Sequence, residues 1–265
     1  MNRIDATFQQ LRRRKKKALI PYLTVGFPSV ALLPALVRAM VEAGADLIEL
    51  GVPFSDPLAD GPTIQAASSW ALRQGVTPGR VIRSVENLRR RGIEVPLVLM
   101  TYYNPVFRYG VKAFCRDCST AGVDGLIVPD LPPEEADELR QSARSRGLDA
   151  IFLAAPTSPG ERLRRIARAS SGFVYDVSLT GVTGARNGLP PGLEGHVRML
   201  RGMTTLPVCV GFGISDGPQV RLVTRVADGA IVGSALLNVI GKSARDPVKQ
   251  AASFIRKLKA ACDEK

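Results

Sequence analysis

Glu49 and Asp60 form a candidate acid–base pair, one at the end of an apolar run and one in the loop that follows it. The run DLIELG (46–51) reads as a strand, and side-chain alternation places Glu49 on one of its faces. If that face is buried, desolvation disfavours the charged carboxylate, which suits a group that exchanges a proton near neutral pH. The prolines of PFSDPLADGP stiffen the loop that carries Asp60. The alternative is a solvent-facing glutamate before an ordinary turn.

Three glycine-rich segments follow later apolar runs and are typical of phosphate-binding turns. They are GVTGARNG (181–188), GFGISDG (211–217) and GSALL (233–237). Backbone N–H groups in such turns, aimed by a helix N-terminus, bind phosphate without a charged side chain. Two such segments after neighbouring strands favour a phosphate site over simple tight turns. The first segment is longer and more polar, which also makes it a candidate mobile lid.

The elements that must position these residues alternate regularly between strands and helices. Short runs rich in Val, Ile and Leu are typical of parallel strands buried on both faces. Eight occur, at 18–25, 46–51, 95–101, 124–130, 149–156, 172–178, 207–213 and 228–234. Amphipathic helical stretches separate them, and several helix-to-strand junctions share a small residue followed by Asp.

This repeat predicts an α/β fold, a single (β/α)₈ TIM barrel that occupies residues 1–265 as one catalytic domain. We expect an extra N-terminal helix at about 2–14, two helices within 62–93, and a short phosphate-binding helix after strand 8. A doubly wound open sheet is the alternative, but no GxGxxG follows the first strand.

Four further side chains lie near strand ends and are candidates for an apolar pocket: Tyr22, Met100, Ile127 and Tyr175. In a barrel, the carboxyl ends of the strands meet at the face that carries the chemistry. Taken singly, each of the four is equally well explained as ordinary barrel core. An apolar pocket is therefore predicted only from the four residues taken together.

Composition argues against several other classes. The net charge is +12, yet the basic residues are scattered, apart from Arg12–Lys17, and no aromatic stacking motif accompanies them, so we expect no nucleic-acid partner. Cys115 and Cys118 lie in a helical stretch without a second Cys/His pair, and His196 is the only histidine, which argues against a metal site. No apolar run reaches membrane-spanning length, so we expect no membrane partner and a cytoplasmic protein.

The chain resembles the α subunit of tryptophan synthase over nearly its whole length. The matching segments are PYLTVGFPS, ADLIELGVPFSDPLADGPTIQAAS, MTYYNP, GLIVPDLPPEE, APTSPGERL, GVTGAR, VGFGIS and DGAIVGSA. The resemblance implies retro-aldol cleavage of indole-3-glycerol phosphate to indole and glyceraldehyde 3-phosphate. Alternatives are a stand-alone lyase that releases indole, an epimerase or isomerase acting on sugar phosphates, and a basic nucleic-acid-binding protein.

The same resemblance implies roles for individual residues. Glu49 is the expected general acid–base, and Asp60 the expected acceptor for the indole N–H. Thr183 matches the lid residue that closes towards Asp60. The phosphate cradle is expected at Gly184, Gly213, Gly233 and Ser234, the indole pocket at Tyr22, Met100 and Ile127, and an active-site tyrosine at Tyr175.

A partner is implied as well. Members of the family dock on a pyridoxal-phosphate β subunit in an α–β–β–α heterotetramer, so no cofactor is expected in this chain. The expected contact is the loop that contains Pro53, Phe54, Asp56 and Pro57.

Asp176 is an unusual residue for its place, because alternation turns it outward from strand 6 and beneath the helices. A lone buried carboxylate is costly. We therefore expect a basic or backbone partner, such as an arginine from helix 5 or 6.

Overall fold

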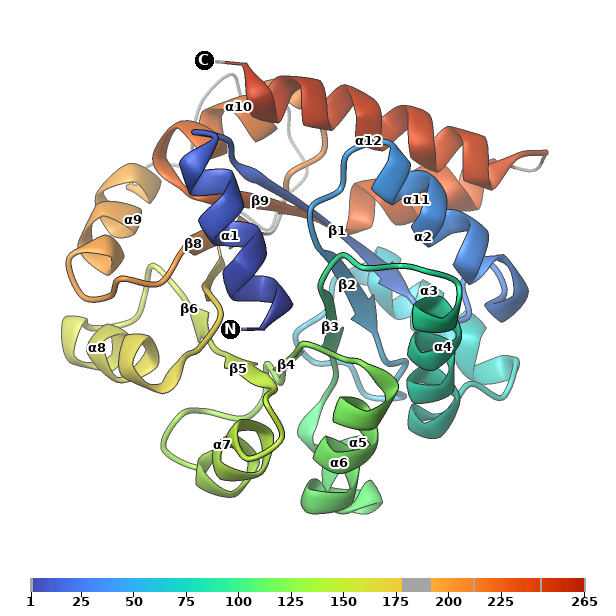
Figure 1. Ribbon diagram of the computed structural model, residues 1–265, viewed down its shortest axis with the longest axis horizontal. Coiled ribbons are helices and arrows are strands. Elements are labelled where there is room, and N and C mark those ends of the chain that lie inside the picture. Colours follow the sequence, from blue (N-terminus) through green and yellow to red (C-terminus); the bar gives the residue numbers. More distant parts are fainter. Residues whose placement is uncertain (1, 178–191, 212, 244, 265) are drawn as a thin grey trace.

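The computed structural model describes residues 2–177, 192–211, 213–243 and 245–264. Within these residues, parallel strands form one nine-stranded sheet that curves into a barrel inside a ring of helices (Figure 1). The strands are β1 (Ala18–Thr24), β2 (Ile48–Gly51), β3 (Leu97–Met100), β4 (Gly125–Ile127), β5 (Asp149–Ile151), β6 (Leu153–Ala154), β7 (Val174–Val177), β8 (Val208–Gly211) and β9 (Gly229–Val232).

The predicted (β/α)₈ barrel is confirmed, and the extra strand has a local cause. The sheet order is β5-β4-β3-β2-β1-β9-β8-β7-β6, so its two ends are consecutive pieces of the fifth predicted run. Phe152 separates the pieces, and its carbonyl accepts the N–H of Tyr175 on β7 at 3.1 Å. The fifth run therefore pairs with β4 through its first half and with β7 through its second half.

Helices cover the outside of the barrel, and the predicted extra helices are all present. The N-terminal helix, two helices between the second and third strands, and a short helix after the last strand are confirmed. The described helices are α1 (Arg3–Arg13), η1 (Val30–Leu32), α2 (Leu33–Glu42), α3 (Pro62–Arg73), α4 (Pro78–Arg90), α5 (Tyr103–Tyr109), α6 (Val111–Ala121), α7 (Asp137–Arg144), α8 (Gly160–Ala169), α9 (Leu193–Arg201), α10 (Gly217–Val226), α11 (Ser234–Lys242) and α12 (Pro247–Asp263).

Helix α1 covers the end of the barrel where the strands begin (Figure 1). Its buried side chains include Ile4 and Phe8. The Phe8 ring lies 5.9 Å from the ring of Phe173, just before β7. Ile4 packs so closely over Gly125 that a Cβ there would lie 3.1 Å from its Cδ1. With one end plugged by apolar side chains, the opposite end remains for a site.

Aspartates at the strand starts explain the repeated junction seen in the sequence. Each accepts a backbone N–H from the first or second residue of the strand before it, which would otherwise be a buried unpaired donor. The pairs are Asp46 with Leu19 at 2.8 Å, Asp124 with Leu97 at 2.8 Å, and Asp228 with Val208 at 3.0 Å. A nearby cation balances each carboxylate: Lys259, Arg89 and Arg201, respectively.

Asp176 on β7 is completely buried, and the expected basic partner is a histidine rather than an arginine. His196 of α9 places Nε2 3.0 Å from Asp176 Oδ1, although the angles are not those of a hydrogen bond. Burial raises the pKa of Asp176 to about 7 and lowers the pKa of His196. The Asp176 carboxyl is therefore about half protonated near pH 7 and His196 is mostly neutral, which reduces the cost of burying them.

The two closely spaced cysteines are helical, as predicted. Cys115 and Cys118 lie on α6, buried and unpaired. In the part of the chain that the structure describes, none of the helices combines the length and apolar character needed to cross a bilayer.

Candidate active site

Glu49 lies near the carboxyl end of β2 and is only 1% exposed. Its register partners are Tyr22 on β1 and Val98 on β3, both buried. Oε1 has no hydrogen-bond partner among the described residues. Burial raises the pKa of Glu49 to about 8, and the charge of Asp60 adds to the effect. The carboxyl is therefore mostly protonated near neutral pH, as an acid catalyst must be.

Asp60 is held by turns in the loop between β2 and α3. Its N–H donates to the Pro57 carbonyl at 3.0 Å, and its own carbonyl accepts from Gln65 Nε2 at 2.8 Å. Burial raises the pKa of Asp60 to about 6, while a hydrogen bond from Tyr102 lowers it. Asp60 is therefore mostly ionised at pH 7. Two neighbouring carboxyls with pKa values on opposite sides of neutrality suit one acid and one acceptor.

Two buried tyrosines, Tyr22 and Tyr175, lie beside Glu49. Burial, and then the charges of Asp60 and Glu49, raise the pKa of both phenols, so both remain neutral. Each ring lies over a glycine of the next strand. A Cβ on Gly51 would collide with the Tyr22 hydroxyl, and a Cβ on Gly211 with the Tyr175 hydroxyl. The glycines at these strand ends thus make room for the aromatic side chains.

Met100 and Ile127 continue the site across β3 and β4. Met100 is the register partner of Gly51 on one side and of Ile127 on the other. Both side chains are buried. Register partners in a parallel sheet point to the same face, so these residues form an apolar wall beside Glu49.

The predicted phosphate turns that the structure describes lie at the ends of neighbouring strands. Gly213 follows β8 with φ +76°, a conformation that favours glycine. Gly233 joins β9 to α11, and Ser234 is the first residue of that helix. The N–H groups of the first turn of α11 have no partner within the helix, so they can bind an anion. Thr183 and Gly184 lie outside the described residues.

Tyr102 belongs to the same cluster, and the sequence analysis missed it. It is buried just beyond β3, and its hydroxyl accepts the N–H of Ala59 at 3.0 Å. Its ring centroid is 5.3 Å from that of Phe54. Tyr102 stands two residues after Met100, on the same face by alternation. That spacing in MTYYNP was a signal that could have identified it.

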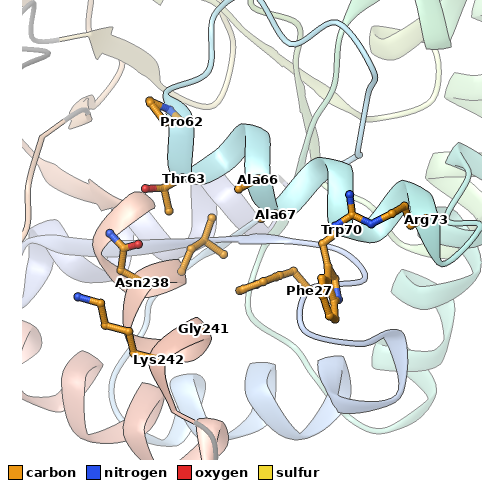
Figure 2. Close-up of a pocket in the computed structure, with 11 residues that line it drawn as sticks. Phe27, Pro62, Thr63, Ala66, Ala67, Trp70, Arg73, Asn238, Gly241 and Lys242 are labelled. Carbon is orange, nitrogen blue, oxygen red and sulfur yellow. The ribbon is translucent and has the colours of Figure 1, made fainter.

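A separate groove of about 490 Å³ runs between α3 and α11 beside this cluster (Figure 2). Its lining includes Phe27, Trp70 and Lys242, and within the described residues it includes no carboxylate. The Trp70 indole N–H donates to the Pro28 carbonyl at 2.8 Å, which ties α3 to the loop after β1. The groove lacks the acid–base groups found at the ends of the strands.

Comparison with known proteins agrees with this arrangement. A family model described as tryptophan synthase alpha chain matches residues 8–263. The tryptophan synthase alpha chain of Roseiflexus castenholzii is 53% identical over 260 residues, which cover 98% of this chain and 100% of that protein. A crystal structure of tryptophan synthase subunit alpha from Legionella pneumophila superposes with a TM-score of 0.92 at 38% identity, covering 99% of this chain and 98% of that one.

An aminoacrylate-bound tryptophan synthase from M. tuberculosis gives a TM-score of 0.88 at 38% identity, with 98% of this chain and 99% of that one covered. The family model and the curated relative both match nearly the full length of the chain. The chain therefore belongs to the tryptophan synthase alpha chain family.

Proposed function

We propose that Glu49 and Asp60 carry out the carbon–carbon lyase reaction that this chain catalyses as a tryptophan synthase alpha chain. That reaction is the retro-aldol cleavage of indole-3-glycerol phosphate into indole and glyceraldehyde 3-phosphate. The observation that carries the assignment is a fully buried Glu49 at the carboxyl end of β2 with Asp60 close by in the loop that follows. Burial raises the pKa of Glu49 to about 8 and that of Asp60 to about 6.

In the proposed mechanism, protonated Glu49 gives its proton to the indole carbon that bears the glycerol side chain. The ring then carries a positive charge, and ionised Asp60 stabilises it by accepting a hydrogen bond from the indole N–H. The Glu49 carboxylate next takes the proton of the adjacent glycerol hydroxyl while the carbon–carbon bond breaks. The bonding electrons return to the ring and restore neutral indole. Glu49 ends protonated, as it began.

The remaining residues are proposed to bind the substrate at its two ends. The indole would lie against the apolar wall and the two tyrosines: Tyr22, Met100, Ile127 and Tyr175. The phosphate would be held by backbone N–H groups of Gly184, Gly213, Gly233 and Ser234, the last two at the start of α11. Thr183 is also proposed to close towards Asp60.

No cofactor of this chain enters these steps, because the protonated indole ring itself accepts the electron pair of the broken bond. Pyridoxal phosphate is proposed to reside in the partner β subunit, where it supplies the chemistry that joins indole to serine. We propose that one domain spanning residues 1–265 is sufficient for the cleavage, since the proposed groups that the structure describes all belong to one barrel.

Family membership implies a β-subunit partner, and we propose that the loop after β2 contacts it within an α–β–β–α heterotetramer. The loop contains Pro53, Phe54, Asp56 and Pro57. Leu58 next to them is 92% exposed, and Phe107 on α5 is 64% exposed. Large apolar side chains open to solvent at the barrel mouth are typical of a surface that another protein covers.

Asp60→Asn and Asp56→Asn test the two halves of the proposal with matched changes in one loop. Asp60→Asn should lower indole release from indole-3-glycerol phosphate on the order of a hundredfold, as expected for loss of a transition-state charge partner. Asp56 is exposed, so Asp56→Asn should retain the activity of the isolated chain and weaken only its activation by the β subunit. Equal losses in both variants would contradict the assignment of Asp60.

A further inference from the structure

Tyr102 touches the β2–α3 loop in three ways. Its ring contacts Phe54 at one end of the loop, with centroids 5.3 Å apart. Its hydroxyl accepts the backbone N–H of Ala59 at 3.0 Å. The same hydroxyl lies beside the Asp60 carboxylate, and hydrogen bonding between the two lowers the pKa of Asp60 and raises that of Tyr102. Tyr102 is 4% exposed and lies between β3 and α5, so it is fixed by the barrel rather than by the loop.

The hydrogen bond from the Ala59 N–H leaves the Tyr102 hydroxyl able to donate its own proton. A tyrosine hydroxyl has one proton to donate and lone pairs to accept with. Because the Ala59 N–H occupies the acceptor side, the proton of Tyr102 is free to point at Asp60. Burial, and then the charge of Asp60, raise the pKa of Tyr102, so the hydroxyl keeps its proton and stays a donor. Hydrogen bonds from a neutral donor to an ionised carboxylate are short and strong.

Tyr22 is another phenol close to Asp60, and it is arranged differently. Its hydroxyl lies 3.2 Å from Thr24 Oγ1, and the charge of Asp60, rather than a hydrogen bond with it, adds to the burial that raises the pKa of Tyr22. Tyr102 is therefore the phenol that is directed at Asp60.

We propose that Tyr102 is a positioning residue whose hydroxyl aims the Asp60 carboxylate at the indole N–H and keeps it in its charged form. The proposal rests on the function assigned to Asp60 above. It also gives the loop a physical connection to the site, because the Phe54 ring at the partner-facing end packs on the same side chain that holds Asp60.

The test is Tyr102→Phe, which keeps the ring against Phe54 and removes only the hydroxyl. kcat/KM for indole-3-glycerol phosphate should be measured across pH with the β subunit present at saturating concentration. The wild-type acid limb should reflect Asp60, with a pKa of about 6. In Tyr102→Phe the limb should move up by about one pH unit, and the plateau should fall on the order of tenfold. Tyr103→Phe, the same change one residue along, is the control and should change neither the pH of the acid limb nor the plateau value of kcat/KM.

A double variant separates positioning from a general structural effect. With Asp60→Asn already present, removing the Tyr102 hydroxyl should cause no further loss, because the two groups act as a unit. Losses that multiply, or an unmoved acid limb in Tyr102→Phe, would overturn the proposal. If Asp60→Asn alone leaves activity intact, the proposed function of Asp60 fails instead.

A second substitution covers the case in which Tyr102→Phe does not fold. Replacing Tyr102 with 3-fluorotyrosine keeps the hydroxyl and makes it a stronger donor, because the fluorine acidifies the phenol. The acid limb should then move to lower pH, opposite to the Phe variant. A limb that stays in place or moves upward would also overturn the proposal.

Discussion

Replacing Glu49 with Gln should stabilise the fold while it removes the proposed acid. Burial raises the pKa of Glu49 from 4.5 to about 8. A group whose pKa is raised by folding contributes its stability fully below the unfolded pKa, and the contribution is lost as the pH rises to the folded pKa. The wild type should therefore lose stability between pH 4.5 and about 8. The Gln variant, which cannot ionise, should not show this loss.

The magnitude follows from the size of the pKa shift. Each pH unit inside this window changes the free energy of unfolding by about 1.4 kcal/mol. At pH 7 the wild type should be less stable than the variant by roughly 3 kcal/mol from this cause alone. Glu49 is fully buried, so solvent screening does not reduce the figure much.

Urea unfolding provides the assay, with fluorescence of Trp70, the only tryptophan, as the signal. Both proteins should be compared at several pH values between about 5 and 8. The stability gap should widen with pH at the slope given above. Glu42→Gln, at an exposed position, is the control, and its difference in unfolding free energy from the wild type should not change with pH. If the stability difference between the wild type and Glu49→Gln is also independent of pH, the reasoning from burial is refuted.

Three further predictions concern the same site and its support. Gly51→Ala should destabilise the fold by about 1–3 kcal/mol and raise KM, because the new methyl group collides with the Tyr22 hydroxyl; unchanged urea unfolding and KM would contradict this. Asp60→Asn should move the basic limb of residual activity below about 8, because the Asp60 charge helps to raise the pKa of Glu49; a limb that stays in place would rule out this coupling. His196, the only histidine, should show a single pair of imidazole C–H NMR resonances that titrate together below pH 6.5, and titration above that value would contradict the effect of burial.

Much of the barrel and part of the site could be predicted because strand periodicity is local. The apolar runs marked each strand, and alternation along DLIELG placed Glu49 on one face. The prolines and glycine around Asp60 indicated a stiff loop at a strand end. These features depend on residues that are neighbours in the chain. The roles of Thr183 and Gly184 remain predictions.

The features that the sequence analysis missed depend on contacts between distant segments. Tyr102 follows β3, whereas Ala59 and Asp60 lie in the loop after β2. The hydrogen bond from the Ala59 N–H to the Tyr102 hydroxyl forms only when that loop folds towards the end of β3. The split of the fifth strand at Phe152 comes from pairing with a different neighbour on each side. His196 meets Asp176 because α9 packs over β7, so local pattern indicated the need for a partner but not its identity.

The most direct test of the account is indole release from indole-3-glycerol phosphate, measured for the wild type and Glu49→Gln, alone and with the β subunit. The account predicts weak activity for the wild type alone, strong activation by the partner, and near-complete loss in the variant under both conditions. Glu49→Gln that still folds and releases indole at the wild-type rate would contradict the central claim that Glu49 supplies the proton.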